Sequence, residues 1–136
     1  QFTNLEKQGY DLFVIHCNSC HTEPLFTDLS YRNNGLDSTF TDKGRFRITQ
    51  QNQDMGKFKV PTLRNINLTY PYMHDGRFRN LETVLDHYEN TVSSATLDTT
   101  LENGIKLRDS EKTAIIAFLY TLTDYSLLTN PKLSKP

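Results

Sequence analysis

The sequence predicts an all-α fold of one domain, in which a few helices are joined by long irregular loops. Three stretches carry apolar residues at spacings of three and four, which is the spacing of one face of a helix. No run of alternating apolar and polar residues is long enough to predict a sheet. Residues 24–71 are rich in Asn, Asp, Gly, Thr and Gln and show no sustained period. An irregular stretch of this size in a compact domain is expected only where a ligand or a partner organises it.

The first helix is predicted to begin after Thr3, because Thr3 and Glu6 have the spacing of a capping box. Five residues then recur on one face, and the chain continues directly into a Cys-x-x-Cys-His motif at residues 17–21. The residues of this face are Leu5, Gly9, Leu12, Phe13 and His16.

A second helix is predicted after Asn80, a good N-cap residue, with an apolar stripe that leaves His87 just to one side. The stripe consists of Leu81, Val84, Leu85 and Tyr88. Residues 98–103 are expected to form a further turn or two.

The clearest helix is predicted to open at Ser110 with Thr113 and to bury a stripe near the end of the chain. This stripe consists of Ile115, Ile116, Leu119 and Leu122. We place the domain at residues 1–124 and a C-terminal tail, rich in Leu, Ser, Asn and Pro, at residues 125–136.

Charge and composition exclude several classes of protein. Fifteen Lys and Arg against sixteen Asp and Glu give a net charge of −1, which disfavours nonspecific binding to nucleic acid or anionic lipid. No apolar run approaches the ~20 residues of a membrane span, and the first residues lack the regions of a signal peptide. We therefore expect a soluble chain from which any export signal has been removed. Apolar residues make up 36% of the chain, and its six glycines do not raise this share to the usual ~45–50%.

The motif at residues 17–21 is the attachment signal for haem c. Residues three apart lie on one side of a helical turn, so Cys17 and Cys20 can bond two vinyl groups at one edge of the porphyrin while His21 ligates the iron. Structural zinc would need a fourth ligand, and the chain has no second Cys pair. A thioredoxin-like dithiol would follow a strand, whereas here a helix is predicted before it. Covalent haem is favoured, and it supplies apolar bulk that the composition lacks.

The second axial ligand of the iron is left open by the pattern. Met is usual in electron-transfer cytochromes, and Tyr and His also ligate haem iron. Each such residue downstream also has an ordinary role in packing or at the surface, so position alone does not choose among them. The five are Met55, Met73, His74, His87 and Tyr88.

The chain resembles the C-terminal half of the bacterial dihaem cytochrome c peroxidases, a family that includes the enzyme that matures the tryptophan tryptophylquinone cofactor. The most specific part is Val-Pro-Thr-Leu-Arg-Asn at residues 60–65 followed by Pro-Tyr-Met-His-Asp-Gly at residues 71–76. The resembling segments keep the family's order and cover nearly the whole chain: 17–21, 42–47, 58–65, 68–76, 81–88 and 114–123.

This resemblance implies a cytochrome c-like helical domain around one covalent haem, with His21 as the proximal ligand. Where the peroxidases carry a distal Met, the segments laid together without gaps place Tyr88, as in the cofactor-maturing enzyme. An oxygen ligand of this kind favours ferric over ferrous iron. Tyr88 is therefore expected to give a low potential, with Met73 and then Met55 as fallback ligands.

The resemblance also implies roles around the haem. The backbone carbonyls of Thr69 and Pro71 are expected to help hold a calcium ion between two haem domains. A buried guanidinium pairs well with a haem propionate, and a histidine beside the haem can donate to the same group. These roles are expected for Arg64 and His74.

The implied function is electron transfer within a peroxidase-like oxidoreductase of the periplasm. The haem of this chain would accept electrons from a small donor cytochrome or cupredoxin. It would pass them to a peroxidatic haem in an N-terminal half, which the 136 residues do not contain, so the chain alone should show weak or no peroxidase activity. A free-standing mono-haem carrier is the alternative, and an interaction module of a larger envelope assembly is a third reading. The free-standing carrier predicts Met ligation and is disfavoured by the long irregular loop.

Overall fold

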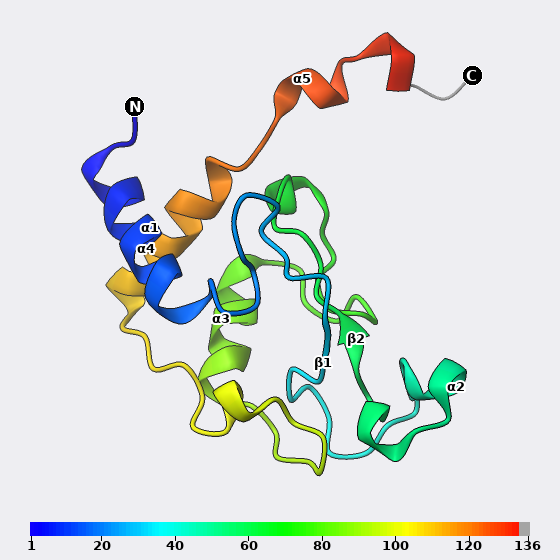
Figure 1. Ribbon diagram of the computed structural model, residues 1–136. Helices are drawn as coiled ribbons and strands as arrows, with labels where there is room; N and C mark the ends of the chain where they lie inside the picture. Colours follow the sequence, from blue (N-terminus) through cyan, green and yellow to red (C-terminus); the bar gives the residue numbers. More distant parts are fainter. Residues whose placement is uncertain (134–136) are drawn as a thin grey trace.

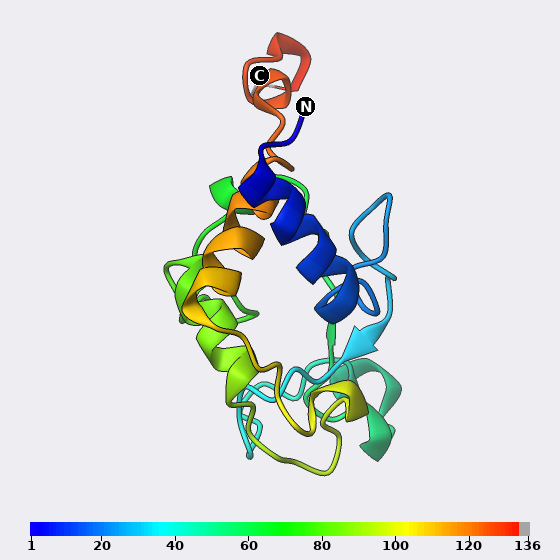
Figure 2. The ribbon, with the colours of Figure 1, turned by 90° about the vertical axis from the view of Figure 1, so that its left-hand side faces the viewer.

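The computed structural model describes residues 1–133, and the last three residues of the predicted tail lie outside this part. The helices and strands follow in the order α1 (Asn4–His16), β1 (Tyr31–Arg32), α2 (Phe46–Thr49), β2 (Phe58–Lys59), α3 (Leu81–Glu89), α4 (Asp109–Tyr120) and α5 (Tyr125–Leu128). Four 3₁₀ turns lie between or after them: η1 (Asn52–Asp54), η2 (Ile66–Leu68), η3 (Thr99–Leu101) and η4 (Pro131–Leu133). Helices α1, α3 and α4 and the loops around the two strands surround the middle of the molecule (Figures 1 and 2).

Helices α1 and α4 form the packed end of the domain. Gly9 permits their close contact, because a Cβ at this position would overlap the backbone carbonyl of Ala114. Phe13 and Phe118 are almost completely buried here, with ring centroids 5.2 Å apart. Leu5, which the sequence places on the buried face, is instead 44% exposed, because it lies in the first turn, beyond this contact.

The helix ends follow the capping signals of the sequence closely. The Thr3 hydroxyl accepts a hydrogen bond from the Glu6 N–H, and the Glu6 carboxylate accepts one from the Thr3 N–H, as the capping box predicts. The Asn80 side chain caps α3 by accepting from the Thr83 N–H. Helix α4 begins one residue before the predicted Ser110, with Arg108 as its N-cap residue.

The irregular segment between α1 and α3 contains a small sheet that the sequence did not predict. Strands β1 and β2 pair antiparallel, with Tyr31 opposite Lys59 and Arg32 opposite Phe58. Two residues per strand are too few to show an alternating pattern, so the sheet arises from tertiary contacts. The prediction of an all-α fold is therefore correct only in part: the fold combines helices and long irregular loops with one two-stranded sheet.

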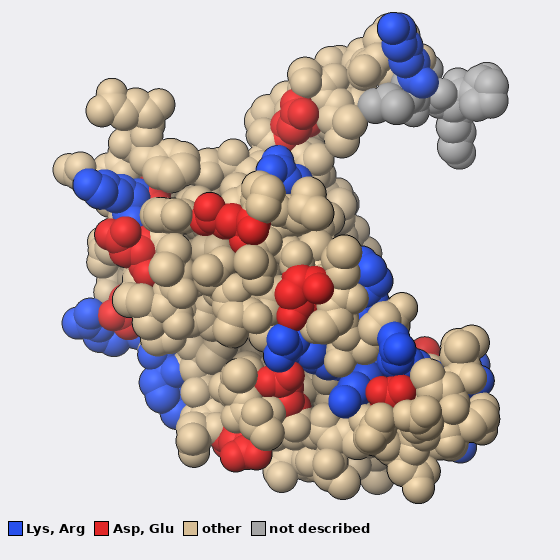
Figure 3. Space-filling view, viewed as in Figure 1, with Lys and Arg blue, Asp and Glu red and all other residues tan. Residues whose placement is uncertain are grey.

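The last described residues extend away from the body of the domain (Figure 1). Within the predicted tail, α5 begins at Tyr125, and the Asp124 carboxylate caps it by accepting from the Ser126 N–H. No helix among residues 1–133 is long and apolar enough to cross a membrane. Acidic and basic side chains are interspersed on the face shown in Figure 3.

Candidate functional site

An apolar cavity of about 430 Å³ lies between the end of α1, the inner faces of α3 and α4, and the loop that carries residues 58–74. Its apolar walls include the predicted stripe of α3, namely Leu81, Val84, Leu85 and Tyr88, together with Ile115 and Leu119 of α4. Ligand pockets usually measure about 300–1,000 Å³ and carry a few placed polar groups on apolar walls. The cavity therefore has the size and lining of a site for a large apolar ligand.

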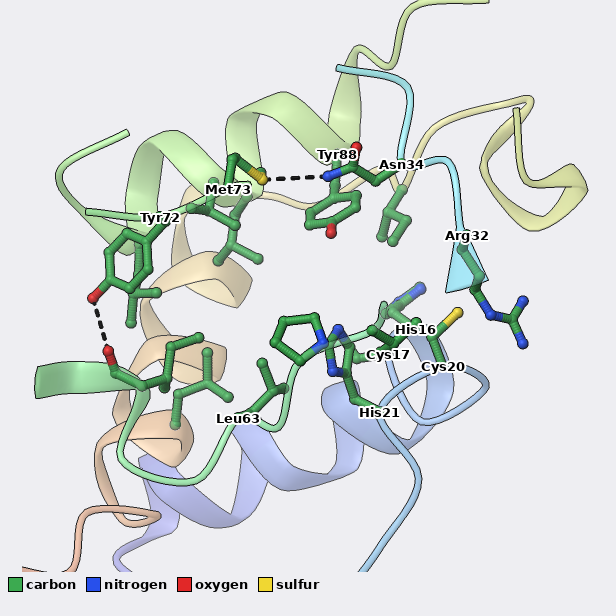
Figure 4. Close-up of a pocket in the computed structure, with 18 of the residues that line it drawn as sticks. His16, Cys17, Cys20, His21, Arg32, Asn34, Leu63, Tyr72, Met73 and Tyr88 are labelled. Carbon is green, nitrogen blue, oxygen red and sulfur yellow. Dashed lines mark hydrogen bonds between the residues drawn. The ribbon is translucent and has the colours of Figure 1, made fainter. Parts of the chain in front are cut away.

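The two cysteines enter this cavity from the turn that directly follows α1. The Cys17 N–H donates to the Phe13 carbonyl at 2.8 Å, and the His21 N–H donates to the Cys17 carbonyl at 2.9 Å. These bonds continue the helical course, so Cys17, Cys20 and His21 all line the cavity (Figure 4). Both thiols are free, and burial raises the pKa of Cys17 to about 12. A thiol that stays protonated at neutral pH argues against reactive dithiol chemistry.

The imidazole of His21 is oriented by the backbone. Its Nδ1 lies 3.2 Å from the carbonyl oxygen of Phe26, which only accepts hydrogen bonds, so Nδ1 carries the proton. Burial lowers the pKa of His21, which favours the neutral ring. Nε2 therefore keeps its lone pair, the state in which a histidine binds a metal while its second nitrogen donates to a carbonyl.

Tyr88 lies on α3 at the opposite side of the cavity, and its hydroxyl points into the cavity toward the side of His21 (Figure 4). Burial raises the pKa of Tyr88 to about 12, so the side chain is a neutral phenol at neutral pH in the absence of a positive ion. A phenol oxygen and an imidazole nitrogen thus face each other across an apolar space.

The other four ligand candidates are placed differently. Met73 lines the cavity, but its sulfur accepts a hydrogen bond from the Asn34 side-chain amide at 3.3 Å. His74 also lines it and stacks on the Phe58 ring with centroids 3.7 Å apart. His87 and Met55 are not among the lining residues.

Arg64 does not line the cavity. Its guanidinium donates to the Pro24 carbonyl and lies over the Phe26 ring, so the side chain is exposed on the outside of the loop. Arg32 lines the cavity instead, and it pairs with Asp28 at 2.7 Å and with Asp98 at 2.8 Å. The sequence gives no signal for this position, because Asp98 is remote in the chain.

Thr69 and Pro71 both line the cavity at its outer edge, and both are exposed. Within residues 1–133, no group of three or more His, Cys, Asp or Glu side chains is arranged to hold a metal ion. The calcium site expected from the resemblance uses backbone carbonyls, so it stays a prediction.

Comparison with known proteins finds relatives across most of the chain, although no family model matches it. The cytochrome c551 peroxidase of Nitrosomonas europaea is 37% identical over 123 residues, which are 87% of this chain and 34% of the relative. The methylamine utilization protein MauG of Paracoccus denitrificans is 30% identical over 168 aligned positions, covering 91% of this chain and 43% of the relative.

Solved structures of similar proteins have the same fold as this chain. A MauG-like protein associated with microbial copper homeostasis superposes with a TM-score of 0.90 and 36% identity, covering all of this chain and 52% of that chain. The diheme peroxidase BthA of Burkholderia thailandensis shares the fold with a TM-score of 0.71 at 21% identity, over 92% of this chain and 44% of that one.

The fold and site therefore define a cytochrome c-like helical domain. The chain is homologous to the dihaem cytochrome c peroxidases and MauG proteins, which confirms the resemblance predicted from its motifs. It spans about a third to two fifths of the length of these curated relatives.

Proposed function

We propose that this chain binds one haem c covalently and serves as the electron-transfer domain of a dihaem peroxidase-like oxidoreductase. The observation that carries the proposal is an apolar cavity into which Cys17, Cys20 and His21 project from one side and Tyr88 from the other. When bound, the haem supplies an iron that is reversibly reduced and oxidised by one electron. The names of the relatives, peroxidase and MauG, support this class of chemistry.

The residues of the chain have separate tasks in this proposal. The two thiols would hold the porphyrin edge, and the Phe26 carbonyl orients His21 so that Nε2 would be available to the iron. The apolar stripes of α3 and α4 exclude water, which limits the reorganisation that accompanies a change of charge. Tyr88 would hold the iron through its oxygen on the side opposite His21, and an oxygen ligand of this kind would favour ferric iron.

The polar edge of the cavity is proposed to face the haem propionates. Arg32 and His74 line the cavity and suit this role, whereas Arg64, the residue expected from the resemblance, is engaged with Pro24 on the outer side. We retain the proposal that the carbonyls of Thr69 and Pro71 contribute to a calcium site between two haem domains.

The partners follow from the length of the relatives. Because this chain aligns with only a third to two fifths of each curated relative, we propose that it works beside an N-terminal domain with a peroxidatic haem. It would receive electrons from a small donor cytochrome or cupredoxin and pass them to that haem, where hydrogen peroxide is reduced. Residues 1–124 would form the haem domain, with 125–136 as its tail, in the periplasm where haem c is attached.

The test is expression of the chain with a periplasmic leader and haem c maturation machinery. We expect a mass increase of one haem that survives denaturation, and its loss in the double variant Cys17→Ser, Cys20→Ser. The purified chain should accept electrons from a reduced cytochrome and should reduce hydrogen peroxide only weakly. Peroxide turnover by this chain at ordinary enzyme rates would contradict the assignment of the chemistry to a second haem.

A further inference from the structure

Asn34 connects the two side chains that compete as the second iron ligand. Its side-chain amide donates to the Met73 sulfur at 3.3 Å. Its backbone carbonyl accepts from Nε2 of His87 at 2.9 Å, and His87 directly precedes Tyr88 on α3. Asn34 thus bridges the loop that carries one ligand candidate and the helix that carries the other.

Asn34 is itself held in place by its neighbour. Asn33 is 2% exposed, and its side-chain amide donates to the hydroxyls of Ser94 at 2.9 Å and Thr96 at 3.0 Å. The side-chain oxygen of Asn33 accepts from the Gly35 N–H at 2.9 Å, which closes the turn around Asn34. The Asn34 amide is therefore presented to Met73 from a fixed backbone.

Met73 is fixed on its side as well. It has a left-handed backbone conformation with φ of 72°, and its carbonyl accepts from the Gly76 N–H at 3.2 Å. Figure 4 shows the Met73 sulfur directed at the Asn34 amide, while the Tyr88 hydroxyl points into the cavity. The same sulfur lone pairs that accept this hydrogen bond are the ones a thioether uses to bind iron.

We propose that Asn34 is a positioning residue that keeps the Met73 sulfur away from the iron and so leaves the second axial position to Tyr88. The inference rests on the proposed function, since it presupposes the haem. Its consequence is electronic, because a thioether raises the potential of a haem whereas an anionic oxygen lowers it.

The experiment uses the haem-loaded chain in the Tyr88→Phe background, where the second axial position is free. Asn34→Leu removes the amide but keeps the size, and Asn34→Asp removes the donor while keeping the shape. Both leave the backbone carbonyl that binds His87. The matched control is Asn103→Leu, an exposed asparagine outside the cavity lining. The readouts are the near-infrared absorption band of thioether-ligated ferric haem, the spin state by electron paramagnetic resonance, and the midpoint potential.

We expect no thioether band in Tyr88→Phe alone or with Asn103→Leu. The band should appear when either Asn34 variant is added, with a rise in potential for Asn34→Leu, which adds no charge, and it should vanish when Met73→Leu is added as well. A thioether band in Tyr88→Phe alone, or none after both Asn34 substitutions, overturns the inference. Failure of the proposed function looks different, because the chain would then bind no haem or its ferric spectrum would not respond to Tyr88→Phe.

Discussion

Tyr88 and His21 oppose each other across the cavity for different local reasons. His21 is placed by the turn that continues α1 and by its bond to the Phe26 carbonyl. Tyr88 is placed by helical spacing, since it follows Leu81 and Leu85 on the buried face of α3. Burial raises the pKa of this tyrosine to about 12, so only a strong positive charge nearby would favour its anion at neutral pH. A ferric iron is such a charge.

Substitution Tyr88→Phe should therefore change the haem-loaded protein more than any other tyrosine substitution in the cavity. We expect an altered ferric absorption spectrum and a higher midpoint potential, because the charge donated by the oxygen is lost. Spectroelectrochemical titration measures both. Tyr72→Phe is the matched control: Tyr72 also lines the cavity, but its hydroxyl donates to the Ile66 carbonyl at 3.1 Å. An unchanged ferric spectrum in Tyr88→Phe would defeat the assignment.

At the scale of elements, α1 and α4 are joined by a contact that requires glycine. A Cβ at Gly9 would overlap backbone atoms of Ala114 and approach the Phe118 side chain. Backbone atoms cannot turn aside as a flexible side chain can, so the two helices would have to separate. The geometry of the cavity depends on this contact, because Phe13 of α1 and Ile115 of α4 both line it.

Gly9→Ala is expected to lower the free energy of unfolding by about 1–3 kcal/mol, the usual cost of overpacking, although Ala is the better helix former. Denaturant unfolding of the haem-loaded chain measures this change. Gln8→Ala, one residue away on the exposed side of α1, should stay within about 0.5 kcal/mol of the parent. Equal stability of both variants would mean that the helices separate at little cost.

Arg32 links strand β1 to two loops through its pairs with Asp28 and Asp98. Burial opposes ionisation of Asp28, but hydrogen bonds from Ser30 and the pairing with Arg32 outweigh it and lower its pKa from 3.8 to about 2. A carboxyl whose pKa is lowered by folding stabilises the fold above its unfolded pKa. This contribution is present above about pH 4 and is lost as the pH falls toward 2.

Asp28→Asn should accordingly cost about 1–2 kcal/mol of unfolding free energy at pH 7, allowing for partial solvent screening. The variant should also lose less stability than the parent between pH 4 and pH 2. Denaturant unfolding at several pH values tests both. The control is Asp42→Asn, whose carboxylate lies 3.5 Å from Arg47 in a pair with both side chains at least half exposed. If Asp28→Asn and Asp42→Asn behave alike, the partly buried pair of Arg32 and Asp28 stabilises the fold no more than the exposed pair does.

At the scale of the whole molecule, the cavity takes the place of a conventional core. The buried apolar cluster of α1, α3 and α4 surrounds the cavity rather than filling it. At about 24 cal/mol per Å³, an empty space of 430 Å³ would cost on the order of 10 kcal/mol as an upper limit. This is comparable to the total stability of a typical domain, so we expect a chain with 36% apolar residues to need a large ligand in the cavity to be stable.

Removal of the ligand should therefore unfold much of the domain. We expect the Cys17→Ser, Cys20→Ser chain, prepared without haem, to lose near-ultraviolet circular dichroism and to be cleaved rapidly by proteases. The control is the haem-loaded parent, which should resist cleavage in residues 1–124. A haem-free chain with the sharp thermal transition of the loaded protein would show that the cavity is tolerated empty.

The sequence by itself determined the local features of this protein. Capping residues located α1 and α3, helical spacing identified the buried stripes, and the Cys-x-x-Cys-His spacing identified the turn that enters the cavity. Each depends on residues within about one helical turn, where backbone geometry converts spacing into position. The resemblance carried by residues 60–65 and 71–76 was specific enough to identify the homologous proteins.

Only the tertiary structure decided which polar groups meet in the cavity. In the structure the Tyr88 hydroxyl points toward His21, and the Met73 sulfur accepts a hydrogen bond from Asn34. His87 and Met55 lie outside the cavity lining, and Arg32 lines the cavity where the sequence had suggested Arg64. These contacts join residues far apart in the chain across loops with no period, where spacing fixes no direction. Their placement follows from how the irregular segment packs on α3 and α4, a balance of many small contacts that sequence spacing does not express.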